Sequence, residues 1–178
     1  MTKAERTKAQ LIEKAQFLFW SRGYSNVSLR EITNLAGVDV ALVSRYFGSK
    51  LGLFEATIPL LPALDASQIA DVEDLVERVV DLFASGERGG DGPSPTAFIL
   101  MNANDPEVGD LVRTAYKARW QVHLDALIGD KRRAADFSAA MLGMSIAEKA
   151  LHLDGIADYR TSAYKDQLRS LLRKTISG

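Results

Sequence analysis

Three side chains with DNA-binding chemistry lie close together around residue 45. Arg45 and Tyr46 are neighbours, and Lys50 follows them shortly along the chain. A guanidinium group can fork onto the O6 and N7 atoms of guanine or pair with a phosphate, and a tyrosine hydroxyl can donate to a phosphate. An ammonium group binds the nucleic-acid backbone by charge alone. The pattern predicts a surface for double-stranded DNA. The alternatives are that Arg45 is a solvated charge and that Tyr46 belongs to the core.

Two short helices would position these side chains. Ser28 and Glu31 have the spacing of a capping box, which predicts a helix that begins at residue 29 and ends near Gly37. Asp39 is the next N-cap candidate and predicts a helix over 40–46. We expect glycine at the turn because a side chain would hinder the sharp reversal. Two capped helices around a tight turn are the layout of a helix-turn-helix, whose second helix enters the major groove.

Other residues of this segment could also reach DNA. Val40 and Leu42 could touch a thymine methyl group, unless Leu42 is buried. Ser28 is first a helix cap, and the amides beside it form a natural seat for a phosphate. Arg30 points outward and could reach a groove edge. The predicted DNA-binding residues are Ser28, Arg30, Val40, Ala41, Leu42, Ser44, Arg45, Tyr46 and Lys50.

A first helix over about 5–22 would support the two short ones. Its apolar residues recur at three- and four-residue spacing, and Gly23 follows as a left-handed stop. The charged residues before and within it are either a basic arm or a frayed, soluble terminus: Lys3, Arg6 and Lys8. An apolar seam would hold the short helices against it: Leu29, Ile32, Leu35, Val38, Val43 and Phe47.

The rest of the chain is also expected to be helical, which makes the fold all-α with about nine helices. Ser49 caps a fourth helix that continues to about Pro59, and the only clear loop is 86–95. The remaining helices are expected at about 71–85, from Pro95 to near Asn104, from 104–106 to Gly129, over 132–153 and over 158–176.

Composition narrows the class of protein. The chain has 178 residues, of which 47% are hydrophobic and 25% charged, so it can form one large domain or two small ones. It has no cysteine and no apolar run near the roughly 20 residues of a membrane span, and its start lacks a secretory signal, so the expected location is cytoplasmic. Residues 1–50 carry eight basic and four acidic side chains (+4), whereas the remaining 128 carry 14 and 19 (−5). This asymmetry favours a basic head and an acidic body, unless it is chance.

The N-terminal residues resemble those of a known family. The chain reads Leu11-Ile12-x-x-Ala15-x-x-Leu18-Phe19-x-x-x-Gly23-Tyr24, then Ser28-Leu29-Arg30-Glu31-Ile32 with Ala36-Gly37-Val38, then Val43-x-x-Tyr46-Phe47-x-Ser49-Lys50-x-x-Leu53-Phe54. These three runs, in register over roughly residues 6–58, are similar to the DNA-binding region of the tetracycline-repressor (TetR) family.

The resemblance implies a dimeric transcription regulator, most often a repressor. Its domains would be a helix-turn-helix DNA-binding domain over 1–50 and a helical ligand-binding and dimerisation domain over 51–178. A palindromic operator and an unidentified small-molecule effector would be its partners, with no cofactor, no metal and no membrane. Many members have Tyr at the position of Ser44, Glu at that of Leu51, and Ser-x-Gly-Thr where this chain has 39–42. These departures mean that the operator cannot be inferred from relatives.

The rear part of the chain offers weaker candidates. Apolar side chains with a few polar groups are typical of ligand sites, although each could be plain core. The candidates are Phe83, Phe98, Met101, Asn102, Tyr116, Trp120 and His123. In the resembled family the last two helices form the dimer through a four-helix bundle. By that resemblance the interface candidates are Ala139, Gly143, Ala147, Leu168, Leu171 and Leu172, with packing inside the chain as the alternative.

Catalysis is not indicated by the sequence. It has two histidines, and neither a phosphate loop nor a nucleophile elbow. We therefore expect no enzyme activity. Two alternatives to a ligand-controlled regulator stay open: a DNA-binding helical protein that a protein partner controls or that nothing controls, and a helical enzyme that uses a cavity in the rear domain.

Overall fold

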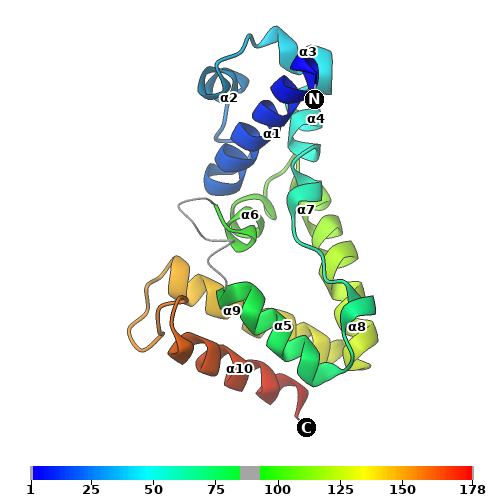
Figure 1. Cartoon of the computed structure of the whole chain (residues 1–178), viewed down its shortest axis with the longest axis vertical. Coiled ribbons are helices and arrows are strands. Elements are labelled where there is room, and N and C mark those ends of the chain that lie inside the picture. The colour runs from blue at the N-terminus through cyan, green and yellow to red at the C-terminus, as the bar shows by residue number, and fades with distance from the viewer. Residues whose placement is uncertain (1, 85–92, 178) are drawn as a thin grey trace. The chain divides into compact units, whose positions relative to one another are not determined.

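The computed structural model describes residues 2–84 and 93–177, and within these ranges every regular element is helical (Figure 1). This confirms the all-α prediction. The α-helices are α1 (Lys3–Arg22), α2 (Leu29–Ala36), α3 (Ala41–Phe47), α4 (Lys50–Glu55), α5 (Val72–Ala84), α6 (Pro95–Asn102), α7 (Gly109–Tyr116), α8 (Val122–Ile128), α9 (Lys131–Lys149) and α10 (Ser162–Ile176). Short 3₁₀ turns lie at Ile58–Leu60 and Ala66–Gln68. Most of the loop expected at 86–95 lies outside the described residues.

Helix α7 continues through a π-helical turn (Lys117–Gln121) into α8. With this run counted as one helix, the described ranges hold nine, as the periodicity indicates. The run begins at Gly109 and not at 104–106, because Asp105 Oδ1 accepts the amides of Glu107 and Val108 and so holds a turn before the helix. It ends at Gly129, which is left-handed with φ 73°.

The described residues form two compact units. One takes in the residues up to Pro62 together with Pro93 to Ala115, and the other takes in Ala63 to Ala84 together with Tyr116 to Ser177. Helices α4 and α6 therefore pack with the N-terminal helices. The functional boundary that we expect after residue 50 remains a prediction.

The first unit is built on a cluster of aromatic rings. Phe19 lies 5.4 Å from Phe54 and Trp20 lies 5.1 Å from Phe98, measured between ring centroids. Because Phe98 belongs to α6, this cluster fixes α6 against α1 and α4. Tilted and edge-to-face pairs of this kind stabilise by roughly 0.5–1.5 kcal/mol each beyond the apolar area that they bury.

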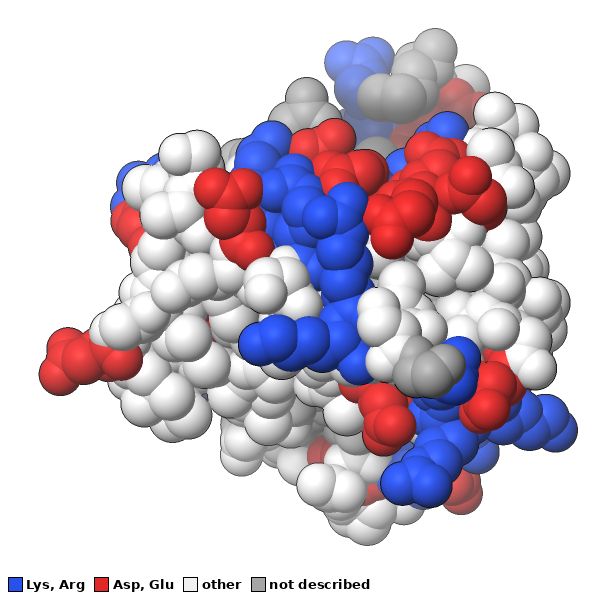
Figure 2. Space-filling model, turned by 90° about the horizontal axis from the view of Figure 1, so that it is seen from below, with Lys and Arg blue, Asp and Glu red and all other residues white. Residues whose placement is uncertain are grey.

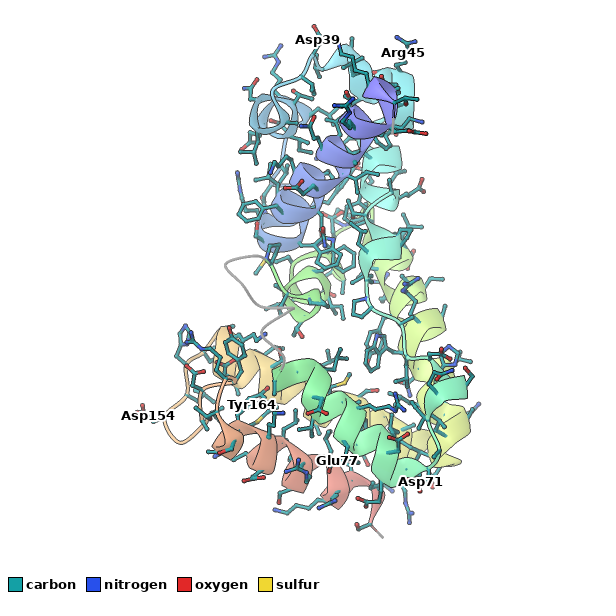
Figure 3. All side chains as sticks on the ribbon, viewed as in Figure 1. Asp39, Arg45, Asp71, Glu77, Asp154 and Tyr164 are labelled. Atoms are coloured by element: carbon teal, nitrogen blue, oxygen red, sulfur yellow. The ribbon has the colours of Figure 1, made fainter. Side chains whose placement is uncertain are left out.

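The second unit packs α5, α9 and α10 around an apolar core. Charged pairs join α5 to α10 along one side: Glu77 accepts from Arg169 at 2.6 Å, Glu73 accepts from Arg173 at 2.8 Å, and Asp81 accepts from Lys165 at 2.9 Å. In Figure 3, Glu77 lies on the side of α5 that faces α10. Figure 2, seen from below, shows a band of Lys and Arg side chains with Asp and Glu on either side of it.

No helix among the described residues is long and apolar enough to cross a membrane.

Candidate nucleic-acid interface

Helix α2 begins and ends as the sequence predicts. Ser28 Oγ accepts the Glu31 amide at 3.2 Å, and the Glu31 carboxylate accepts the Ser28 amide at 2.8 Å, which completes the capping box. The helix ends at Gly37, whose φ of 66° is left-handed. A Cβ at Gly37 would meet nothing within 4 Å. Glycine is therefore favoured by the backbone conformation and not by crowding, which corrects the reason that we expected.

Helix α3 presents one face outward. Asp39 Oδ1 accepts the Ala41 amide at 2.7 Å, so Asp39 helps to start the helix, although Val40 is the residue at the N-cap itself. Val43 is fully buried and anchors the helix to the core. The exposed residues of this segment are Asp39, Val40, Ala41, Ser44 and Arg45. Figure 3 shows Asp39 and Arg45 at the same end of this unit, with Arg45 projecting from the ribbon.

Two leucines of these helices lie differently from what the sequence predicts. Leu35 is 51% exposed and does not belong to the seam, because α2 turns this position to its outer face. Leu42 is partly buried against the core, which lies between the two alternatives for this side chain. Val40, at 43% exposed, stays available for an apolar contact with a base.

Tyr46 has two cations near its ring. Lys8 Nζ is 5.4 Å and Arg45 Cζ 5.9 Å from the centre of its ring. Tyr46 also makes an edge contact with Phe47 and packs against the core on one side. Lys8 belongs to α1, which a second capping box between Thr2 and Glu5 starts at Lys3. The charged start of the chain is therefore helical, and the Lys8 side chain reaches Tyr46 on α3.

The N-terminus of α2 is partly occupied by an acid. The Glu31 carboxylate bonds to Ser28 and pairs with Arg22 at 2.9 Å, and its hydrogen bonds to Ser28 and Arg22 lower the pKa of Glu31 to about 2. A phosphate at this helix end would have to use the amides of Leu29 and Arg30, which have no acceptor within the helix. The Arg30 side chain is exposed.

Lys50 is the first residue of α4, which the Ser49 side chain caps as predicted. Its Nζ lies 4.1 Å from the centre of the Tyr24 ring. Burial lowers the pKa of Lys50, and the nearby carboxylates of Glu107 and Asp105 oppose that shift. The partners of Lys50 are therefore in place before any nucleic acid binds. These partners could not be predicted from the sequence, because residues 24 and 107 are far apart in the chain and carry no shared local motif.

The ligand-site candidates are divided between the two units. Phe98, Met101 and Asn102 belong to the first unit, and Phe83, Tyr116, Trp120 and His123 to the second. Asn102 is fully buried: its Oδ1 accepts the Tyr24 amide at 2.7 Å, and its Nδ2 donates to the carbonyls of Phe19 and Phe98. All its polar atoms are used in joining α6 to α1. Tyr116 differs, since its hydroxyl is buried without a hydrogen-bond partner among the described residues.

The interface candidates also divide into two kinds. Ala139 and Gly143 are exposed on α9, Ala147 is half-buried beside them, and a Cβ at Gly143 would meet nothing within 4 Å. Leu168 and Leu172 are fully buried in the core of their own unit, and Leu171 is half-buried. The intrachain alternative is therefore favoured for Leu168 and Leu172, because their side chains are already covered.

The described residues hold no group of three or more His, Asp or Glu side chains that could bind a metal ion.

The N-terminal region is similar to known regulatory proteins. The family model described as "Bacterial regulatory proteins, tetR family" matches residues 11–57. The probable HTH-type transcriptional regulator YttP of Bacillus subtilis (strain 168) is 49% identical over 49 residues, 28% of this chain and 24% of that protein. The HTH-type transcriptional repressor BdcR of Escherichia coli (strain K12) is 26% identical over 117 residues, 61% of this chain and 59% of that protein. The matches thus span about a quarter and three fifths of these two relatives.

Solved structures share the fold of nearly the whole chain. NalD, the secondary repressor of the MexAB-OprM multidrug efflux pump in Pseudomonas aeruginosa, superposes with a TM-score of 0.74 at 17% identity over 97% of this chain and 98% of that one. The TetR family regulator CifR, in complex with double-stranded operator DNA, gives a TM-score of 0.61 at 16% identity over 94% of each chain.

Helices α2 and α3 with the turn between them have the layout of a helix-turn-helix, and the family model that matches this region is one of regulatory proteins. Within the N-terminal region, residues 11–57 match the TetR family model, in agreement with the resemblance of these residues to that family.

Proposed function

We propose that the chain is a sequence-specific transcriptional repressor that binds a palindromic operator as a homodimer and leaves it when a small molecule binds the second unit. The observation that carries the DNA-binding part is the outward face of α3, where exposed Arg45 lies beside Tyr46. Repression is supported by the relatives BdcR and NalD, which are repressors by name.

Homodimerisation would set the geometry of recognition. Two recognition helices read successive major grooves when they lie about 34–36 Å apart, which corresponds to half-sites one turn of DNA apart. The exposed small residues of α9 support close approach of a second copy. On the DNA we assign base contacts to Arg45 and Val40, and backbone contacts to Tyr46, Lys50 and the start of α2.

Release by an effector requires that the effector bind the two states of the protein with different affinity. The buried, unpartnered hydroxyl of Tyr116 next to a π-helical turn supports a polar ligand group in the second unit, because π turns often occur at functional sites. The alternative is a DNA-binding regulator that a protein partner controls or that nothing controls. The ligand-controlled repressor and this alternative are both non-catalytic, and each would act in the cytoplasm.

Selection of duplexes from a random-sequence library by the full chain tests the proposal. We expect recovery of a sequence with two inverted half-sites, bound more weakly as salt rises because phosphate contacts release counterions. DNA binding would be contradicted if no duplex were enriched, or if the affinity for the enriched duplex did not change with salt. A gel-shift screen of small molecules on the selected duplex then tests release, and unchanged affinity across a broad screen would favour the alternative without a ligand.

A further inference from the structure

A chain of contacts joins Lys50 to the segment between α6 and α7. The Lys50 ammonium lies over the Tyr24 ring, and the hydroxyl of that ring donates to Glu107 Oε1 at 2.6 Å. The next residue, Ser25, donates from its hydroxyl to Asp105 Oδ2 at 2.6 Å. One aromatic ring therefore has the first residue of α4 on its face and an acid from the α6–α7 segment at its hydroxyl.

The electrostatics of this arrangement hold the ammonium group in place. Burial and the hydrogen bond to Glu107 raise the pKa of Tyr24, so the phenol stays a neutral donor. A phenol that donates to a carboxylate has a more electron-rich ring, and such a ring attracts a cation more strongly. Among the described residues Lys50 forms no ion pair, yet Glu107 and Asp105 are close enough to act on its charge.

A DNA phosphate would compete with these groups for the same ammonium. The ring and the two carboxylates attract Lys50 toward the α6–α7 segment, whereas a phosphate attracts it toward the duplex. Glu107 also repels the phosphate directly, since both are anions. An acid on the α6–α7 segment can thus weaken a contact made at the start of α4.

We propose that Glu107, acting through the Tyr24 ring, restrains Lys50 and so sets how much of its charge is available to a DNA phosphate. Glu107 is a positioning residue in this scheme. The inference rests on the proposed DNA-binding function, and it adds a residue that regulates the strength of one contact with DNA. Asn102 and Asp105 tie the same segment to α1 and to the α1–α2 link, so any displacement of α6 or α7 would reach Lys50 by this route.

A double-mutant cycle on DNA affinity tests the inference. The probe is the duplex that the wild-type chain selects, and the variants are Glu107→Gln, Lys50→Ala and both together. Glutamine keeps an acceptor for the Tyr24 hydroxyl and removes the charge. We expect Glu107→Gln to tighten binding about two- to fivefold, the range of partly exposed charge interactions. When Lys50 is alanine the tightening should be clearly smaller, because only the direct repulsion between Glu107 and the phosphate is then relieved. Equal tightening with and without Lys50, or no tightening at all, overturns the inference.

Glu55→Gln is the matched control, because it removes the same charge from an exposed position on α4 itself. Any effect of this change should add to that of Lys50→Ala. Non-additivity of the same size for Glu55 would mean a general field effect and would overturn the inference. Unfolding midpoints of all variants identify loss of fold, which would appear as weaker and not tighter binding.

A measurement without DNA separates this inference from the function on which it rests. Nuclear magnetic resonance of isotope-labelled methyl groups on lysine gives the pKa of Lys50, and a Lys50→Arg variant assigns its signal. We expect Glu107→Gln to lower this pKa, because a stabilising carboxylate is lost. If the wild-type chain selects no duplex, the proposed function fails. If it selects one, and Glu107→Gln changes neither this pKa nor the affinity, the inference alone fails.

Discussion

Two sets of basic side chains, one in each unit, differ in whether they are paired. In the second unit, three basic side chains of α10 pair with three acids of α5, one pair for each turn of helix. In the first unit, Arg30, Arg45 and Lys50 form no ion pair among the described residues, and Arg45 and Lys50 lie against aromatic rings. The ion pairs of the second unit neutralise these charges within the fold. The unpaired side chains of the first unit remain available to another anion.

This difference explains why a count of charges is a poor guide to a binding face. The band of basic side chains in Figure 2 is flanked by acids, so its field falls off over a short distance. Arg45 lacks such neighbours, and Asp39 at the other end of α3 accepts a backbone amide instead of pairing with it. Uncompensated charge on a short, well-anchored helix is what marks the candidate interface.

Loss of the buried amide that joins α6 to α1 should give the largest effect on stability. Asn102→Ala leaves the buried Tyr24 amide without its acceptor, and it removes one of two donors from the buried Phe19 carbonyl, which keeps the Gly23 amide. We expect a loss of about 3 kcal/mol in the free energy of unfolding. Ser138→Ala in the second unit is the control, since it removes one hydrogen bond, to Gln121 at 2.8 Å, and should cost about 1 kcal/mol. Denaturant unfolding measures both; equal costs would show that Asn102 has no special role.

Removal of an unpaired and a paired arginine tests the charge comparison directly. Arg45→Ala should weaken binding to the selected duplex by about 1–3 kcal/mol and relax its choice of base, if the guanidinium makes a bidentate contact. Arg173→Ala, which breaks the pairs with Glu73 and Glu77, should leave DNA affinity unchanged. Titration of both variants against the selected duplex and against single-base variants of it measures these effects. An equal loss from both changes would contradict the assignment of the interface to α3.

Local signals in the sequence accounted for much of the first unit. The capping box of α2, the left-handed glycine after it and the serine before α4 act within a few residues. The bounds of α2 and the start of α4 could therefore be predicted from the sequence, whereas α4 ends at Glu55 and not near Pro59. Asp105 shows the limit. Its side chain holds a turn, so α7 begins later in the chain than expected. This shift depends on the geometry of the turn and not on composition.

Contacts between distant residues could not be read in this way. The pairing of Lys50 with Tyr24, and of Tyr24 with Glu107, requires α4, the α1–α2 link and the α6–α7 segment to meet. The burial of Leu168 and Leu172 likewise depends on which face of α10 turns toward α5 and α9, and spacing alone is compatible with either face. A single sequence gives helix faces but not their partners.

The turn between α2 and α3 should be sensitive to backbone conformation alone. Gly37→Ala places a side chain at φ 66° with no neighbour within 4 Å, so the expected cost is the strain of a left-handed residue, about 1 kcal/mol. Gly143→Ala on α9 is the matched change in a helical position, where alanine should stabilise the monomer by about 0.8–1.0 kcal/mol. Thermal unfolding at low protein concentration compares the two. A stabilising Gly37→Ala would show that the turn is not held left-handed in solution.

Acid should weaken the ion pairs between α5 and α10, and the resulting loss of stability should be small. The hydrogen bond and charge of Arg169 lower the pKa of Glu77 below its ordinary value of 4.5. A carboxylate whose pKa is lower in the folded state contributes stability above the unfolded value, and that contribution is lost as the pH falls through the folded value. Because Glu77 is partly exposed, we expect less than about 1 kcal/mol from the pair. In Arg169→Ala, the stability measured by denaturant unfolding should therefore fall less between pH 7 and pH 3 than in the wild-type chain. An equal fall in both would mean that the pair is not formed in solution, and that these charges are as unpaired as those of Arg45 and Lys50.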